Sequence, residues 1–168
     1  MIREKVKKMI GFNPLNEEEC LAAVKQNENC IRHIQNPSEK VQLEAVKKNG
    51  YSIQFIHNPS EKIKLEAVKQ DAFSIQYVPN PSEKAQLEAV KQNGRSIQYI
   101  SNPSEKAQLE AVKQNGDSIR YIQNPSEDVQ LEAIRSSKFD IKVIALCPDW
   151  EKFEDYIDKI LDIKDIIE

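Results

Sequence analysis

Apolar and polar residues follow a pattern that returns every 22 residues through most of the chain. In the copy that begins at Asn80, Leu87 and Val90 are three residues apart, as on one side of an α-helix, with Ala89 between them. A second, shorter apolar stretch around Ile97 follows. Further copies begin at Asn36, Asn58, Asn102 and Asn124. A fixed period of this length is typical of stacked units, each of which buries its apolar side only against its neighbours.

The start and the end of the longer element are marked by residues with known helix-terminal preferences. Asn80 is expected to cap the helix, Pro81 to occupy its first position, and Glu83 to reach back to the cap. The helix is expected to run about three and a half turns and to end at Asn93, with Gly94 in a left-handed conformation.

The second element is too short for a full helix. Ser96 can cap a single α turn or a 3₁₀ helix that holds Ile97, Tyr99 and Ile100. A β-strand is the competing interpretation, because apolar and polar residues alternate over 96–100. The proline that follows and the helical neighbours favour the turn.

Aligning the copies predicts an all-α solenoid of six repeats over residues 14–145. The first copy is degenerate, and the sixth drifts from the pattern at residues 136–144. Residues 1–13 and 146–168 are expected to form an N-terminal cap and a C-terminal capping helix, with Asp149 as the cap of that helix. The apolar residues assigned to the two caps are Ile2, Val6, Met9 and Ile10, and Trp150, Phe153, Tyr156, Ile157, Ile160 and Leu161.

Stacking places equivalent residues above one another, so that each apolar position becomes a ladder. Leucine, valine or isoleucine, and alanine ladders are predicted to form the core, with alanine keeping neighbouring helices close. The leucines are Leu43, Leu65, Leu87, Leu109 and Leu131; the β-branched residues are Val46, Val68, Val90, Val112 and Ile134; the alanines are Ala45, Ala67, Ala89, Ala111 and Ala133.

Two sets of residues are candidates for binding a partner. The first is an aromatic ladder, headed by His33, that either packs at the rim or grips a ligand: Phe55, Tyr77, Tyr99 and Tyr121. The second varies between copies that are otherwise nearly identical, and marks either unconstrained loop positions or partner-specific contacts: Tyr51, Phe73, Arg95 and Asp117.

Composition and charge narrow the class of partner. The formal net charge of −3 gives no general attraction to nucleic acid. The three cysteines are few and widely spaced, which favours a reducing, cytoplasmic setting. No signal peptide or membrane span is expected. The first residues are basic and the last are acidic, so head-to-tail self-association is conceivable.

The patterns of known catalytic and metal sites are missing from the sequence. No glycine-rich phosphate loop is present, and the only histidines are His33 and His57. Cys30 and His33, with Cys20 nearby, resemble half of a metal site, but isolated residues of this kind are more often structural. We therefore expect neither an enzyme nor a cofactor.

The segment Leu-Glu-Ala-Val-Lys-Gln-Asn-Gly at 87–94 and 109–116, followed by Ser-Ile-Gln-Tyr-Ile, resembles a bacterial and viral repeat domain of unknown function. The longer rhythm from one Asn-Pro to the next is similar to leucine-rich variant repeats over about residues 14–145. That resemblance implies one α-helix and one 3₁₀ helix per unit, stacked into a right-handed superhelix. The chain lacks the iron–sulfur cysteine cluster of that family, so no cofactor carries over.

Together these features predict a non-catalytic, protein-binding repeat scaffold, such as an adaptor or an inhibitor from a bacterium or phage. Two alternatives remain open from the sequence. One is a sponge for a small metabolite or nucleotide, and the other is a helical-repeat nucleic-acid binder.

Overall fold

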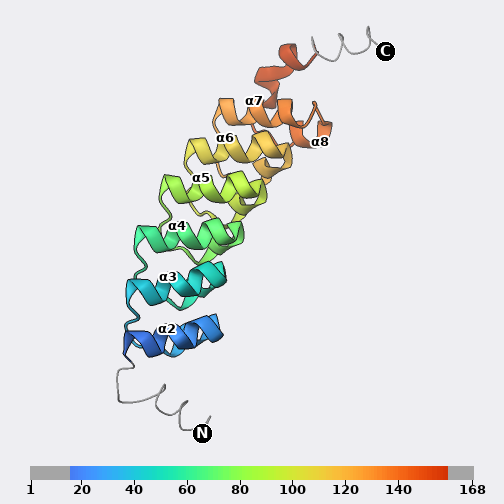
Figure 1. Ribbon diagram of the computed structural model, residues 1–168. Helices are drawn as coiled ribbons and strands as arrows, with labels where there is room; N and C mark the ends of the chain where they lie inside the picture. Colours follow the sequence, from blue (N-terminus) through green and yellow to red (C-terminus); the bar gives the residue numbers. More distant parts are fainter. Residues whose placement is uncertain (1–15, 159–168) are drawn as a thin grey trace. The chain divides into compact units, whose positions relative to one another are not determined.

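The computed structural model describes residues 16–158, which contain α-helices and 3₁₀ helices and no strand (Figure 1). Each α-helix of ten residues is followed by a 3₁₀ helix of six in five successive copies. These pairs are α2 (Glu17–Gln26) with η1 (Glu28–His33), α3 (Glu39–Lys48) with η2 (Gly50–Phe55), α4 (Glu61–Gln70) with η3 (Ala72–Tyr77), α5 (Glu83–Gln92) with η4 (Gly94–Tyr99), and α6 (Glu105–Gln114) with η5 (Gly116–Tyr121). The predicted helical repeat is confirmed, and the second element of these copies is a 3₁₀ helix.

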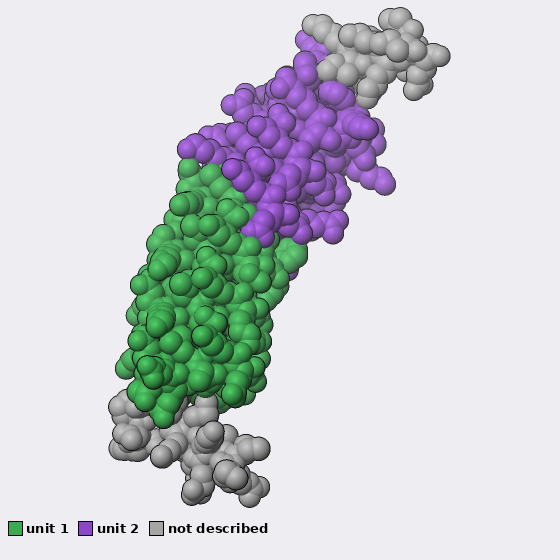
Figure 2. Space-filling model, in the orientation of Figure 1, with its two compact units in different colours: residues 1–89 green, residues 90–168 purple. Residues whose placement is uncertain are grey.

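The chain divides into two compact units, residues 1–89 and 90–168 (Figure 2). In the first unit, α2, α3 and α4 pack side by side, and η1, η2 and η3 pack in the same order. In the second unit, α6 packs against α7 (Glu127–Ser136), and η4 packs against η5. Within each unit these elements therefore contact their neighbours in sequence, as expected for a tandem repeat.

Each α-helix after α2 begins two residues later than the sequence predicted. Serine is the capping residue, as in α3, where the Val41 N–H donates to Ser38 Oγ over 3.4 Å. The asparagine before the proline instead takes a left-handed conformation at Asn36, Asn58, Asn80 and Asn124, with φ between 45° and 51°. Asparagine adopts this conformation more readily than most side chains. It turns the chain from the 3₁₀ helix into the next α-helix.

A reciprocal box of asparagine and glutamate, which the sequence predicted for Asn80 and Glu83, is present instead at α2. There Asn16 Oδ1 accepts from the Glu19 N–H over 2.9 Å, and Glu19 Oε2 accepts from the Asn16 N–H over 3.3 Å. Asn16 lies one period of 22 residues before Ser38, so it takes the capping position that serine holds in the next copy.

The predicted helix ends are also wrong in detail. None of the described glycines has a positive φ. The residue before the glycine is extended, as at Asn93 with φ of −154°, and its side chain accepts from the Arg95 N–H over 3.0 Å. Asn93, not Ser96, thus caps the 3₁₀ helix. The Ser96 hydroxyl is buried and has no hydrogen-bond partner among the described residues.

The core is made of β-branched residues and alanine, and the leucine ladder lies at its edge. The valine, isoleucine and alanine ladders named from the sequence are fully buried. The leucines are only half-buried, so their assignment to the core was wrong. Another ladder, missed in the sequence, takes the buried place four residues before each alanine: Val41, Ile63, Ala85, Ala107 and Val129. Full burial of one valine or isoleucine contributes about 1.5–3 kcal/mol.

The isoleucines of the 3₁₀ helices complete the core from the other layer. The buried residues on this side are Ile31, Ile53, Ile75, Ile97 and Ile119, together with Ile56, Val78, Ile100 and Ile122 just after the 3₁₀ helices. In η2 to η5 a serine is buried as completely as this isoleucine: Ser52, Ser74, Ser96 and Ser118.

Hydrogen bonds join consecutive repeats at both ends of their α-helices. At the N-terminal end the capping serine donates to the first glutamate of the preceding helix: Ser38 to Glu17 over 2.6 Å, Ser60 to Glu39 over 3.0 Å, and Ser126 to Glu105 over 2.8 Å. At the C-terminal end, Lys48 Nζ donates to the Lys25 carbonyl over 2.7 Å, and Gln114 Nε2 to the Val90 carbonyl over 2.7 Å. The two bonds at the C-terminal end pair backbone carbonyls that the helix itself leaves without a partner.

The last copy departs from the pattern, as the sequence indicated. A short α-helix, α8 (Ile141–Ile144), follows α7, and η6 (Trp150–Phe153) leads into helical residues 154–158. Asp149 does not cap η6 with its side chain, contrary to the prediction. Its carboxylate instead accepts from the buried Gln130 side chain over 2.8 Å. Ile157 is buried, whereas Trp150 is exposed.

Some sequence predictions fall outside the described residues. These are the N-terminal cap at residues 1–13, the residues Ile160 and Leu161 of the C-terminal cap, and most charges at the two ends of the chain.

Candidate functional site

All eight candidate binding residues lie on the 3₁₀ helices. The residues that vary between copies occupy the second position of each helix, and the aromatic ladder occupies the last position. The first unit contains Tyr51, Phe55, Phe73 and Tyr77, and the second unit contains Arg95, Tyr99, Asp117 and Tyr121.

In the first unit the structure brings the two sets into contact. The rings of Tyr51 on η2 and Tyr77 on η3 meet edge to face, with centroids 5.9 Å apart and planes at 68°. A variable residue of one repeat thus packs on a ladder residue of the next. Edge-to-face pairs of this kind add about 0.5–1.5 kcal/mol beyond the area that they bury. Nothing in the residue pattern indicates that the variable residues and the aromatic ladder belong to one surface.

The ladder tyrosines are unusually open to solvent for aromatic side chains. Tyr77, Tyr99 and Tyr121 are 40%, 42% and 40% exposed, whereas Tyr51, Phe55 and Phe73 are half-buried. In the second unit, Arg120 pairs with Asp117 over 3.5 Å beside Tyr121. Both partners of this ion pair are about half exposed, so its contribution to stability is small.

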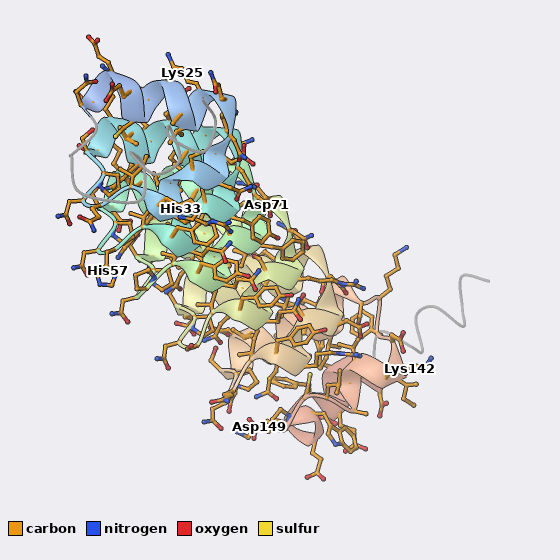
Figure 3. The ribbon with its side chains drawn as sticks, turned by 90° about the horizontal axis from the view of Figure 1, so that it is seen from below. Lys25, His33, His57, Asp71, Lys142 and Asp149 are labelled. Carbon is orange, nitrogen blue, oxygen red and sulfur yellow. The ribbon has the colours of Figure 1, made fainter. Side chains whose placement is uncertain are left out.

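In the first unit, the glutamine before each ladder residue supports its 3₁₀ helix through a hydrogen bond. Gln54 Nε2 donates to the Tyr51 carbonyl, and Gln76 Nε2 to the Phe73 carbonyl, each over 3.0 Å. His33, at the head of the ladder, accepts from Arg32 Nε over 3.0 Å. Figure 3 labels His33, and also His57, whose exposed side chain lies at the edge of the ribbon.

The surface of η2 and η3 carries no formal charge of its own. Residues 49–60 and 72–82 contain no aspartate, glutamate, lysine or arginine, in a chain of which 30% is charged. Two charged side chains at the border of this surface already form hydrogen bonds with backbone groups of the chain. Lys64 Nζ donates to the Pro79 carbonyl over 2.8 Å, and Asp71 accepts from the Phe73 N–H over 2.8 Å.

The cysteines do not form a reactive or metal-binding centre in the described part of the chain. Residues 16–158 contain no group of three potential metal ligands, and the three cysteines are free. Burial raises the pKa of the Cys147 thiol to about 11. Burial, and next the charges of Glu19 and Glu17, also raise the pKa of Cys20. Both thiols therefore remain protonated near neutral pH and are poor nucleophiles.

No helix within residues 16–158 has the length and apolar character needed to cross a membrane.

Comparison with known proteins identifies one similarity. Residues 38–81 match a family described as a domain of unknown function (DUF4116). The matched stretch is two repeat periods long and contains α3, η2, α4 and η3. It therefore includes the Tyr51–Tyr77 pair. No curated protein and no solved structure matches the chain.

Proposed function

We propose that this chain is a non-catalytic scaffold that binds a partner protein through its 3₁₀ helices. The observation that carries the proposal is the placement of the variable and exposed aromatic residues on one type of element, where Tyr51 touches Tyr77. The α-helices, in contrast, repeat nearly the same residues in every copy. Tyrosine, with tryptophan and arginine, is enriched among the side chains that contribute most of the binding energy at protein interfaces.

Within a repeat, the residues that hold the repeats together are different from the residues that vary between copies, which supports this proposal. Buried valine, isoleucine and alanine and the bonds from serine to glutamate hold consecutive repeats together. The outer positions of the 3₁₀ helices are not needed for that packing. They can change from tyrosine to phenylalanine, arginine or aspartate while the backbone of the 3₁₀ helix stays the same.

We further propose that the repeats number six and wind into a right-handed solenoid, and that the protein acts in the cytoplasm as an adaptor or inhibitor of bacterial or phage origin. The 22-residue period supports the count, and the resemblance to leucine-rich variant repeats supports the handedness.

Affinity capture with two matched triple variants tests the proposed surface. Tyr77→Ala, Tyr99→Ala and Tyr121→Ala together remove the exposed ladder, whereas Lys47→Ala, Lys91→Ala and Lys113→Ala change exposed residues on the α-helices. We expect the tyrosine variant to lose a protein that the wild type and the lysine variant both capture. Circular dichroism shows whether both variants are folded. If the tyrosine variant is folded and retains the captured protein in full, the 3₁₀ surface is not the binding site.

A further inference from the structure

The surface of η2 and η3 favours one kind of partner segment, and this inference rests on the proposed function. We propose that residues 49–60 and 72–82 bind an extended, uncharged peptide segment of the partner that has proline or another apolar residue at every third position. Three observations on the first unit support this assignment: its lack of charge, its tyrosine pair and its unpaired asparagine amides. The general spacing of packed helices is consistent with it.

The lack of charge restricts the side chains of the partner. Neither segment contains an ionic group, and Lys64 and Asp71 at the border already hold backbone groups of the chain. A charged partner residue placed here would lose its hydration without gaining an opposite charge. The complementary segment is therefore itself uncharged.

The tyrosine pair provides an apolar platform with a polar edge. Tyr77 meets Tyr51 edge to face, and 40% of its surface is still exposed. Phe55 and Phe73 lie half-buried on the same two helices. Proline-rich segments bind to aromatic surfaces of this type, because they are already extended and lose little entropy on binding.

Asn58 and Asn80 add hydrogen-bonding groups in register with the rings. Each follows the last residue of its 3₁₀ helix by three positions, and each is exposed, with φ of 49° and 45°. Within residues 16–158 neither side-chain amide has a hydrogen-bond partner. An extended backbone has no internal hydrogen bonds, so its carbonyl and N–H groups are open to these amides.

The usual spacing of packed helices is close to the period of such a segment. Neighbouring helices pack about 8–10 Å apart. Three residues of a polyproline II helix advance about 9.3 Å. One residue in three can therefore meet equivalent positions of η2 and η3.

A defined peptide tests this inference on the full-length chain. The probe is a capped twelve-residue peptide of four Pro-Pro-Leu triplets, and its controls are a scrambled peptide of the same composition and a Pro-Pro-Glu peptide. Titration followed by backbone amide NMR detects weak binding. We expect the triplet peptide to shift the signals of residues 49–60 and 72–82, and both controls to bind at least about tenfold more weakly, because they lose the period or bury a charge.

The chain offers matched variants for the rings and for the amides. Tyr77→Ala is expected to weaken binding of the triplet peptide about 30-fold, and Trp150→Ala, which removes an aromatic residue of similar exposure from outside the proposed binding surface, to leave it unchanged. Asn58→Gly with Asn80→Gly keeps the left-handed backbone but removes both amides, and is expected to weaken binding about tenfold. Asn124→Gly, at an equivalent turn with φ of 51°, should have no effect.

Several outcomes would overturn the inference. The inference is wrong if the wild type does not bind the triplet peptide, or if it binds the scrambled or acidic peptide equally well. It is also wrong if the control variants lose as much affinity for the triplet peptide as the test variants do. Binding of oligothymidine in place of the peptide would assign the surface to single-stranded nucleic acid instead. If a captured protein depends on the tyrosines but the triplet peptide does not bind, the proposed function stands and only the peptide class is wrong.

Discussion

Gly50 lies where one repeat comes closest to the next. A Cβ atom at this position would stand 2.4 Å from the Ala67 carbonyl oxygen and 2.5 Å from Ser74 Oγ. The glycine is therefore required by the space between repeats, since its φ is not in the left-handed region. The equivalent position of the following copy is Ala72. Whether glycine is needed at this position therefore depends on which atoms of the next repeat lie against it.

The substitution Gly50→Ala should destabilise the protein by about 1–3 kcal/mol, because a backbone carbonyl must move to admit the new methyl group. Gly94→Ala is the matched comparison. Its nearest atom, the Ala111 carbonyl oxygen, would lie at 3.0 Å, so a smaller shift suffices and the loss should be smaller. Urea unfolding of both variants measures the difference. An equal loss in the two variants would contradict this steric account.

At the scale of elements, the C-terminal segment takes over the bonds that a further repeat would make. Glu127 accepts from Lys152, whereas the equivalent glutamates of other copies accept from a capping serine. Gln130, which is fully buried, donates to the Asp149 carboxylate and accepts from its N–H, each over 2.8 Å. The open side of α7 is thereby closed without another α/3₁₀ pair.

Acid should weaken this closure through Asp149. The hydrogen bond from Gln130, and next the charge of Lys152, lower the pKa of Asp149 below its ordinary value of 3.8. The folded state therefore binds this proton less tightly than the unfolded state. The contribution of Asp149 to stability is complete above pH 3.8 and is lost as the pH falls through the lower pKa of the folded state.

Thermal unfolding between about pH 2 and pH 6, compared for the wild type and Asp149→Asn, tests this expectation. The variant keeps an oxygen acceptor for Gln130 but cannot titrate. The difference in melting temperature between the two proteins should shrink as the pH falls through the pKa of the folded state. A difference that stays constant over this range would exclude a role for the carboxylate charge.

At the scale of the whole molecule, the contacts that join repeats are the same from copy to copy within each unit. Serine-to-glutamate bonds and buried ladders recur with the period, so one copy can replace another as a neighbour. Stability in such a chain is close to a sum over repeats and their interfaces.

Deletion of residues 58–79 should therefore give a shorter protein of the same kind. The deletion joins His57 to Asn80, which restores the Asn-Pro turn and places Ser82 where Ser60 stood. We expect the same helical signal per residue in circular dichroism, and cooperative unfolding. The free energy of unfolding should fall less steeply with urea concentration, because the shorter protein exposes less surface when it unfolds. Deletion of residues 58–68 breaks the period and serves as the control, which should lose helicity. Loss of structure in the full-period deletion would contradict the repeat architecture.

The sequence predicted the repeat and its two helical elements because both depend on local spacing. Apolar residues three and four apart and the Asn-Pro pair are visible in one copy alone. The capping serine was missed because an asparagine directly before a proline is itself a favourable helix start, and only the structure shows that Asn80 takes a left-handed conformation instead. The Tyr51 and Tyr77 positions were both singled out as candidates, but as members of separate sets.

What the sequence by itself determined is the period, the order of a longer helix and a shorter element in each copy, and the positions that vary between copies. The tertiary structure alone decided that Val41 is buried while Leu43 lies at the edge, that Gly50 is needed for a close approach, and that Tyr51 packs on Tyr77. The physical reason is the same in each case. Local periodicity fixes which side of a helix is apolar, but the position of the next repeat fixes which atoms on that side are covered.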